Sequence, residues 1–182
     1  DLHAGANLLS YPSIDSSPLS ASIPDDVEDL FFAIVGEGTA ATITEQGWTG
    51  SLTHFDRASG YWAIVSEDLS FSYETEVVDR IEIKPYVETR PNSREFNVVQ
   101  STSQAFYFVD DITLKEGVIE EGDWLLSYNG NILTGIRQWQ GVMIDIPAMG
   151  LSDSKGTEGY LENGDLPTFK LFKQSTGEYI PL

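Results

Sequence analysis

The chain has 182 residues, which is enough for one large or two small domains that each bury a core. Its 29 acidic and 10 basic side chains give a formal net charge of −19, which repels phosphate backbones and anionic lipids and excludes nucleic acid as an expected partner. Because the chain contains no cysteine, disulfide frameworks and thiolate metal sites are excluded as well.

Hydrophobic runs are short throughout the chain. None approaches the about 20 residues of a membrane-spanning helix, so membrane insertion is not expected. Residues 1–13 lack the basic and apolar regions of a signal peptide, and we expect a mature polypeptide. High acidity, few lysines and many Thr, Ser, Asn and Gly residues among aromatic segments favour an extracellular or cell-surface protein.

A single short helix is predicted near residues 24–32, after a loop rich in serine and proline. Pro24 suits the first helical position, and the carboxylates that follow it complement the helix dipole. Val27, Leu30 and Phe31 recur at spacings of three and four residues and would form its apolar face. We expect one or two turns here and little helix elsewhere.

The rest of the N-terminal half is predicted to form strands, since its aromatic and β-branched runs end at glycine turns. The clearest strand is 60–65, and segment 69–73 alternates apolar and polar side chains. Further strands are expected at 7–11, 31–35, 41–44 and 80–87.

In the C-terminal half the strongest signals are two hairpins. Asn129-Gly130 is a two-residue turn signal that leads into a strand at 132–139. Segment 168–173 is expected to pair with 178–181 across a Ser-Thr-Gly turn. Other predicted strands lie at 96–99, 105–109 and 142–146.

These patterns predict an all-β chain with two modules. The polar segment 88–94, which contains Pro91, is the predicted linker between an N-terminal β module at 1–87 and a C-terminal β module at 95–182. Many short strands between regular turns favour mainly antiparallel sheets, packed as two β-sandwich or jelly-roll-like modules.

Ordered sequence elements give both halves a resemblance to known modules. The N-terminal elements are Asn7-Leu8-Leu9-Ser10, Pro12, the short helix, Trp48-Thr49-Gly50-Ser51-Leu52 and Gly60-Tyr61-Trp62. In this order they resemble a module of large secreted and cell-surface bacterial proteins, many of them from marine organisms.

The C-terminal elements are Gly122-Asp123-Trp124, Asn129-Gly130, Gly135 with Trp139, Gly159-Tyr160 and Gly164-Asp165 with Phe169. They resemble another module of the same kind of protein. The resemblances imply an adhesive, accessory or assembly role and transfer no catalytic residue.

Catalytic signals are weak. His3 and His54 are the only histidines, and no Gly-x-Ser-x-Gly nucleophile motif accompanies them. Paired carboxylates for a glycan hydrolase can be drawn from many acidic residues, and sequence spacing does not fix their separation. The sequence therefore predicts a protein that is not an enzyme, with a hydrolase as a remote alternative.

Aromatic residues provide one candidate ligand site. Exposed tryptophans can serve as platforms for pyranose rings. Trp139, flanked by Arg137, Gln138 and Gln140, is predicted to be the most exposed aromatic and to bind carbohydrate with these neighbours. The other aromatics considered are expected to pack in the core, namely Trp48, Tyr61, Trp62 and Trp124.

Calcium is the inorganic partner that the sequence fits best, because loops rich in acidic residues can supply its oxygen ligands. The candidate ligands are Asp110, Asp111, Asp123, Asp153, Glu158 and Asp165. None of them belongs to a 12-residue Asp-x-Asp-x-Asp-Gly calcium loop. A solvated acidic rim is the simpler interpretation of the same residues.

Taken together, the sequence predicts a noncatalytic extracellular structural or adhesive protein, as a module or subunit of a surface filament or appendage. Its expected partners are further copies of itself or other surface proteins, and no cofactor is required. The alternative is a carbohydrate-binding module that recognises glycans through exposed aromatics with the help of calcium.

Overall fold

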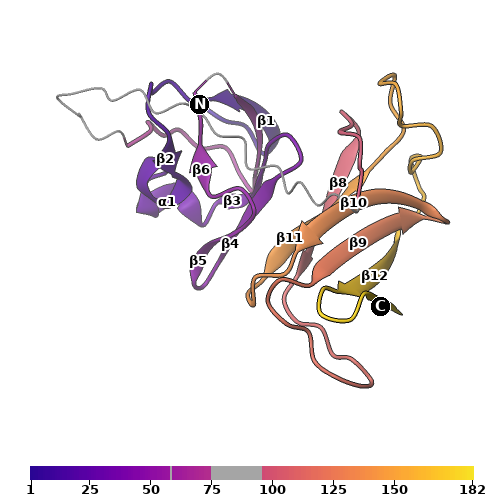
Figure 1. Cartoon of the computed structure of the whole chain (residues 1–182). Coiled ribbons are helices and arrows are strands. Elements are labelled where there is room, and N and C mark those ends of the chain that lie inside the picture. Colours follow the sequence, from indigo (N-terminus) through magenta and orange to yellow (C-terminus); the bar gives the residue numbers. More distant parts are fainter. Residues whose placement is uncertain (58, 75–95) are drawn as a thin grey trace. The chain divides into compact units, whose positions relative to one another are not determined.

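The computed structural model describes residues 1–57, 59–74 and 96–182 (Figure 1). The chain forms two compact units, Asp1–Glu88 and Thr89–Leu182, called here the N-terminal and C-terminal units. The predicted linker at 88–94 and the predicted strand at 80–87 lie outside the described residues, so both stay predictions. Within the described part of the chain, no helix is long and apolar enough to cross a membrane.

The N-terminal unit is built on a five-stranded antiparallel sheet with the order β1-β7-β3-β4-β5. Its strands are β1 (Gly5–Ser10), β3 (Phe31–Val35), β4 (Ala40–Thr44), β5 (Gly47–Gly50) and β7 (Gly60–Val65). Tyr61, Ala63 and Val65 lie at alternate positions of β7 and are all buried, so they mark the inner face of the sheet.

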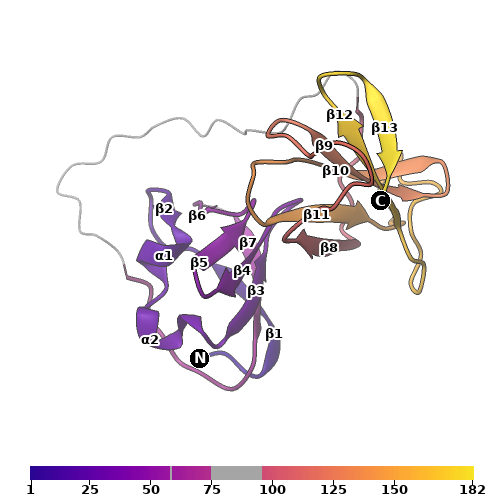
Figure 2. The ribbon, with the colours of Figure 1, turned by 90° about the horizontal axis from the view of Figure 1, so that it is seen from below.

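Short elements of the same unit cover this inner face. They are β2 (Ser17–Pro18), β6 (His54–Phe55), α1 (Leu19–Ser22) and α2 (Asp25–Glu28). Figure 1 shows β2, β6 and α1 gathered beside the sheet, and Figure 2 shows α1 and α2 in succession along one side of the unit. Leu19 of α1 and Phe55 of β6 share one buried core with Ile34 and Tyr61 of the sheet.

The predicted helix near 24–32 is present but shorter than expected. α2 is a single turn, with Pro24 at its N-cap and not at its first helical position. Phe31 was expected both on the apolar face of the helix and in a strand at 31–35. It begins β3, where its ring is buried and stacks edge-on against Trp48. The additional helix α1 was not predicted, because it has neither acidic residues in its first turn nor a side-chain cap.

The C-terminal unit combines a four-stranded sheet, ordered β10-β9-β12-β13, with a two-stranded sheet of β11 and β8. The strands are β8 (Gln104–Val109), β9 (Trp124–Asn129), β10 (Ile132–Gln138), β11 (Ile144–Met149), β12 (Thr168–Lys173) and β13 (Glu178–Pro181). Both predicted hairpins are present, one joining β9 to β10 and the other joining β12 to β13 (Figure 2).

Strand β9 is covered on both faces, which explains why the consecutive residues Trp124, Leu125 and Leu126 are all apolar and buried. Leu125 packs between the two sheets together with Ile146 of β11. On the opposite face, Trp124 packs with Phe96 and Phe172, whose ring centroids lie 5.2 Å apart. The C-terminal unit therefore has an apolar layer on each side of its central strand.

Strands β10 and β11 belong to different sheets but approach closely at Gly135. A Cβ atom at this position would overlap the carbonyl oxygen of Pro147, so the backbones can meet here only if the residue is glycine. Nearby, Nη2 of Arg137 lies 2.6 Å from Oδ2 of Asp145, and its Nε donates a hydrogen bond to the Asp145 carbonyl oxygen at 2.9 Å. These contacts join the two sheets into a sandwich-like unit.

The predicted all-β fold class, with mainly antiparallel sandwich-like sheets, is confirmed. The predictions of strands at 69–73 and 96–99 are wrong. In the first segment only Leu69 forms an isolated bridge, with Leu2, and residues 96–99 form no strand. Phe71 and Phe96 of these two segments contribute their rings to the cores without joining a ladder.

Candidate functional site

The outer face of the five-stranded sheet presents apolar side chains to solvent. Trp62 on β7 lies opposite Leu8 on β1 and opposite Val35 on β3, so these three side chains form a row across adjacent strands. Leu8, Phe32 and Trp62 are 67%, 63% and 51% exposed. We call Leu8, Phe32, Val35, Trp62 and Ile64 the open sheet face.

The exposure of Trp62 corrects the expectation that it packs in the core. Both alternating sets of side chains on β7 are apolar, so the sequence pattern did not distinguish the inner face from the outer one. Tyr61 is buried as expected, and Trp62, its neighbour, points away from the core. Trp48 and Trp124 are partly and fully buried, as their predicted core positions require.

Charge is absent from the open sheet face. Strands β1, β3 and β7 contain no charged residue. The remainder of this unit is strongly acidic, since residues 1–74 hold twelve acidic residues and a single basic one, Arg57. The open sheet face is therefore an uncharged area within a negatively charged unit.

In the C-terminal unit, the predicted carbohydrate-binding residues fall into two groups. Gln138, Trp139 and Gln140 line an open depression of about 520 Å³, together with Glu121, Gly122 and Val142. Arg137 does not join them, because it lies on the other face of β10 in the buried ion pair with Asp145.

Trp139 lines this depression without being a platform. It is only 6% exposed and packs in the core with Ile144, so the expectation that it is the most exposed aromatic is wrong. Flanking polar residues suggested exposure, but they occupy the alternate, outward positions of an extended segment. The sequence did not predict Glu121 and Val142 as lining residues. Gly122 lies in Gly122-Asp123-Trp124, one of the sequence elements on which the C-terminal resemblance rests.

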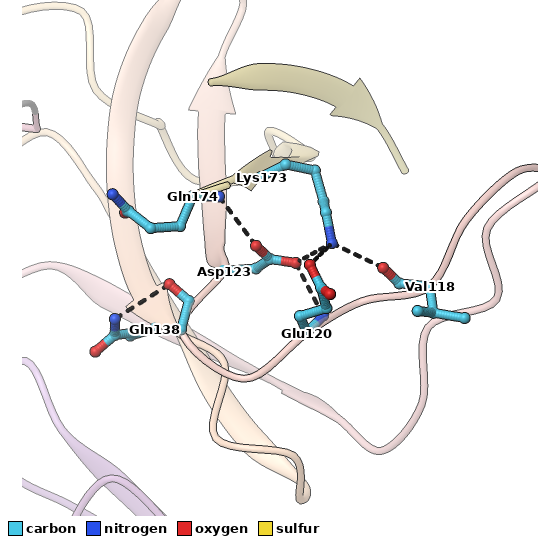
Figure 3. Close-up of polar contacts among 7 residues, drawn as sticks. Val118, Glu120, Asp123, Gln138, Lys173 and Gln174 are labelled. Carbon is cyan, nitrogen blue, oxygen red and sulfur yellow. Dashed lines mark hydrogen bonds and ion pairs between the residues drawn. The ribbon is translucent and has the colours of Figure 1, made fainter. Parts of the chain in front are cut away.

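Asp123 fixes the turn of residues 120–123, which forms one wall of the depression (Figure 3). Its Oδ2 accepts hydrogen bonds from Lys173 Nζ at 2.7 Å and from the backbone N–H of Glu120 at 2.9 Å. Its Oδ1 accepts a hydrogen bond from the backbone N–H of Gln174 at 3.0 Å. Lys173 also donates to Glu120 Oε2 at 3.0 Å and to the Val118 carbonyl oxygen at 2.8 Å, so it ties β12 to the turn.

The same turn is tied to the end of β10 on its other side. The backbone N–H of Gly122 donates to the Trp139 carbonyl oxygen at 2.9 Å, and the N–H of Trp139 donates to the Asp123 carbonyl oxygen at 2.7 Å. Gln138 Nε2 adds a hydrogen bond to the Gly122 carbonyl oxygen at 3.1 Å (Figure 3). Both walls of the depression are therefore held in place by hydrogen bonds.

These contacts shift the pKa values of both ionised groups. Burial is the largest influence on the Asp123 carboxyl and raises its pKa, but the hydrogen bonds from Lys173, Glu120 and Gln174 outweigh it and bring the pKa below its ordinary value of 3.8. The hydrogen bond to Asp123 raises the pKa of Lys173 above 10.5. Both groups stay ionised at neutral pH, which suits a structural clamp better than proton transfer or nucleophilic attack.

Replacing Lys173 with methionine is expected to lower stability in a pH-dependent way. Because the pKa of folded Asp123 is lowered, the stability from this pair is present above pH 3.8 and is lost as the pH falls through the folded pKa. On the alkaline side, the raised pKa of Lys173 keeps the contribution complete up to pH 10.5. Urea unfolding of wild type and Lys173→Met should therefore differ at pH 7 and converge only as the pH falls below the lowered pKa of folded Asp123.

The exposed Lys155→Met substitution is the matched control and should leave stability unchanged at every pH. A difference between wild type and Lys173→Met that stays constant down to the lowest pH would show that Lys173 acts only through packing of its methylene groups.

The predicted calcium ligands are distributed over separate loops. Asp123 is engaged with Lys173, the Asp165 carboxylate accepts the backbone N–H of Glu162, and the Asp111 carboxylate accepts the N–H of Ile112. Asp110, Asp153 and Glu158 are exposed. Among the described residues, no three acidic or histidine side chains come together as a metal-binding group. Calcium binding therefore stays a prediction.

Comparisons with known proteins complete this description. No family model, curated protein or solved structure matches the chain. The resemblance of its two halves to modules of secreted bacterial proteins thus stays a prediction.

Proposed function

We propose that the chain is a noncatalytic adhesive or structural part of an extracellular protein, which binds another surface protein through the open sheet face. The observation that carries this proposal is the row of Leu8, Trp62 and Val35 across three uncharged strands, with Phe32 beside it. Clustered exposed apolar side chains of this kind are typical of interaction surfaces. A large aromatic at the centre of such a surface commonly contributes most of the binding energy.

Charge favours a particular kind of partner. The acidic residues of the N-terminal unit favour a partner whose surface is apolar where it covers the open sheet face and basic elsewhere. They also oppose pairing of this face with the same face of a second copy, since two strongly negative units repel each other at low ionic strength. Another surface protein is therefore the proposed partner, in preference to self-association.

A double variant tests the proposal directly. Leu8→Thr/Trp62→Thr removes the two central apolar side chains, and both positions are exposed, so the fold should be retained. Binding of the labelled chain to intact cells of its source should fall about tenfold or more, because two such anchors contribute about 1–2 kcal/mol each. The measurement is the half-saturation concentration in a cell-binding assay.

Two controls make the result specific. Leu166→Thr also removes an exposed leucine, but from the C-terminal unit, and should bind like wild type. Protease treatment of the cells should abolish binding, whereas periodate oxidation of their glycans should not. Equal binding by wild type and the double variant would refute the role of the open sheet face, and loss of binding only after periodate would favour the carbohydrate alternative.

A further inference from the structure

The depression beside the Asp123 clamp has the chemistry of a small polar binding site. Its lining offers the amides of Gln138 and Gln140, the carboxylate of Glu121 and the apolar side chain of Val142, which is 60% exposed. Trp139 also lines the hollow but is only 6% exposed. Donors, acceptors and an apolar group therefore meet in one open hollow.

We propose that this depression binds neutral carbohydrate. Side-chain amides both donate and accept hydrogen bonds, as hydroxyl groups do, and a carboxylate accepts from hydroxyl groups without needing a counter-charge from the ligand. The apolar C–H groups of a pyranose ring can rest against Val142. The binding mode differs from an aromatic platform, because Trp139 is only 6% exposed and offers no open ring face for stacking.

Electrostatics restrict the ligand further. Among the residues that the structure describes, no cationic side chain lines the depression, and Lys173 is engaged by Asp123 and Glu120. Glu121 and Glu120 make the local potential negative, which disfavours uronic acids, sulfated sugars and phosphates. The class of ligand that remains is an uncharged oligosaccharide.

The site is pre-organised by the bonds that hold its walls. The N–H of Gly122 donates to the Trp139 carbonyl oxygen, the N–H of Trp139 donates to the Asp123 carbonyl oxygen, and Gln138 Nε2 donates to the Gly122 carbonyl oxygen. Little ordering is therefore needed when a sugar binds. Because the hollow is open and small, we expect weak binding, with a dissociation constant of about 1 mM.

Chemical-shift titration of the full chain with neutral hexasaccharides tests the proposal. The probes are cellohexaose, laminarihexaose and mannohexaose, with hexagalacturonate as the anionic counterpart, each to about 10 mM. At least one neutral probe should shift the side-chain amide signals of Gln138 and Gln140 and the indole signal of Trp139. Hexagalacturonate should bind at least about fivefold more weakly.

Substitutions decide whether the depression is responsible. Gln140→Ala and Glu121→Ala should each weaken binding about fivefold or more, while Gln46→Ala, an exposed glutamine in the N-terminal unit, should have no effect. Failure of all three neutral probes to move these signals would overturn the proposal, as would unchanged affinity in Gln140→Ala and Glu121→Ala or tighter binding of hexagalacturonate. Because the open sheet face lies in the other unit, Leu8→Thr/Trp62→Thr should bind the sugar normally whether or not the proposed adhesive function holds.

Discussion

Gly135→Ala is expected to destabilise the C-terminal unit by more than about 3 kcal/mol, because a Cβ atom cannot be accommodated where β10 crosses β11. The added atom would overlap the carbonyl oxygen of Pro147 and would lie 2.6 Å from Ser127 Oγ. Backbone atoms supply the closest contact, so rotation of a side chain does not relieve it. The two strands must separate, and the adjoining hydrogen bond from Ser127 Oγ to Pro147 must lengthen or break.

Denaturant unfolding monitored by circular dichroism measures this effect. Gly60→Ala is the matched control, since its added Cβ meets nothing closer than 3.8 Å and its backbone has no positive φ. It should change the free energy of unfolding by less than about 1 kcal/mol. If Gly135→Ala proves as stable as Gly60→Ala, the close approach of β10 and β11 is not present in solution.

Arg137→Met should cost about 3–5 kcal/mol of stability, because it leaves the Asp145 carboxylate buried without its cationic partner. Asp145 is fully buried, and the shortest contact of the pair is 2.6 Å. Removing one member of a buried ion pair is more harmful than removing both, since the second removal eliminates the unpaired charge. Arg137→Met/Asp145→Leu should therefore recover most of the lost free energy.

Comparison of the single and double variants by urea unfolding tests this explanation. Arg57→Met removes an exposed arginine and should change stability by less than about 0.5 kcal/mol. A double variant that is no more stable than Arg137→Met would indicate that Arg137 acts through its packing and its bond to the Asp145 backbone, not through charge neutralisation.

Strands with clear turn signals at their ends were predictable from sequence. Segment 60–65 begins at Gly60 and forms β7 with the predicted bounds. Segments 168–173 and 178–181 pair as predicted, with Lys173 opposite Glu178. Each of these ladders joins segments with strong β-forming residues, so local pattern and tertiary pairing agree.

Other elements depend on distant partners that a local pattern does not contain. Segment 69–73 alternates like a strand, but apart from the bridge at Leu69 no neighbouring strand pairs with it in the described structure. The ladder of β2 with β6 is only two residues long and involves Pro18, which disfavours a strand prediction. Pairing partners, not intrinsic preference, decide such short segments.

The candidate sites were only partly predictable for the same reason. Gln138 and Gln140, which were predicted to bind carbohydrate beside Trp139, are exposed and line the depression, because alternate positions of an extended segment share a side. The buried partnership of Arg137 with Asp145 joins strands of different sheets, and no sequence periodicity reports such a crossing. The open sheet face was missed because both faces of β7 are apolar, so only the packing of α1 and β6 reveals which face is covered.

The direction of the β1–β7 ladder has a mechanical consequence. Gly5 pairs with Val65, and the Leu2–Leu69 bridge extends the pairing beyond that end, so the chain enters and leaves the ladder at the same end. If force were applied to the chain before Leu2 and after Leu69, the backbone hydrogen bonds between β1 and β7 would break one pair after another, starting from the Leu2–Leu69 end. They would not share the load, as they would if the two strands were pulled past each other. In a tethered protein this separation would move Leu8 of β1 away from Trp62 of β7, so load on the chain would break up the open sheet face itself.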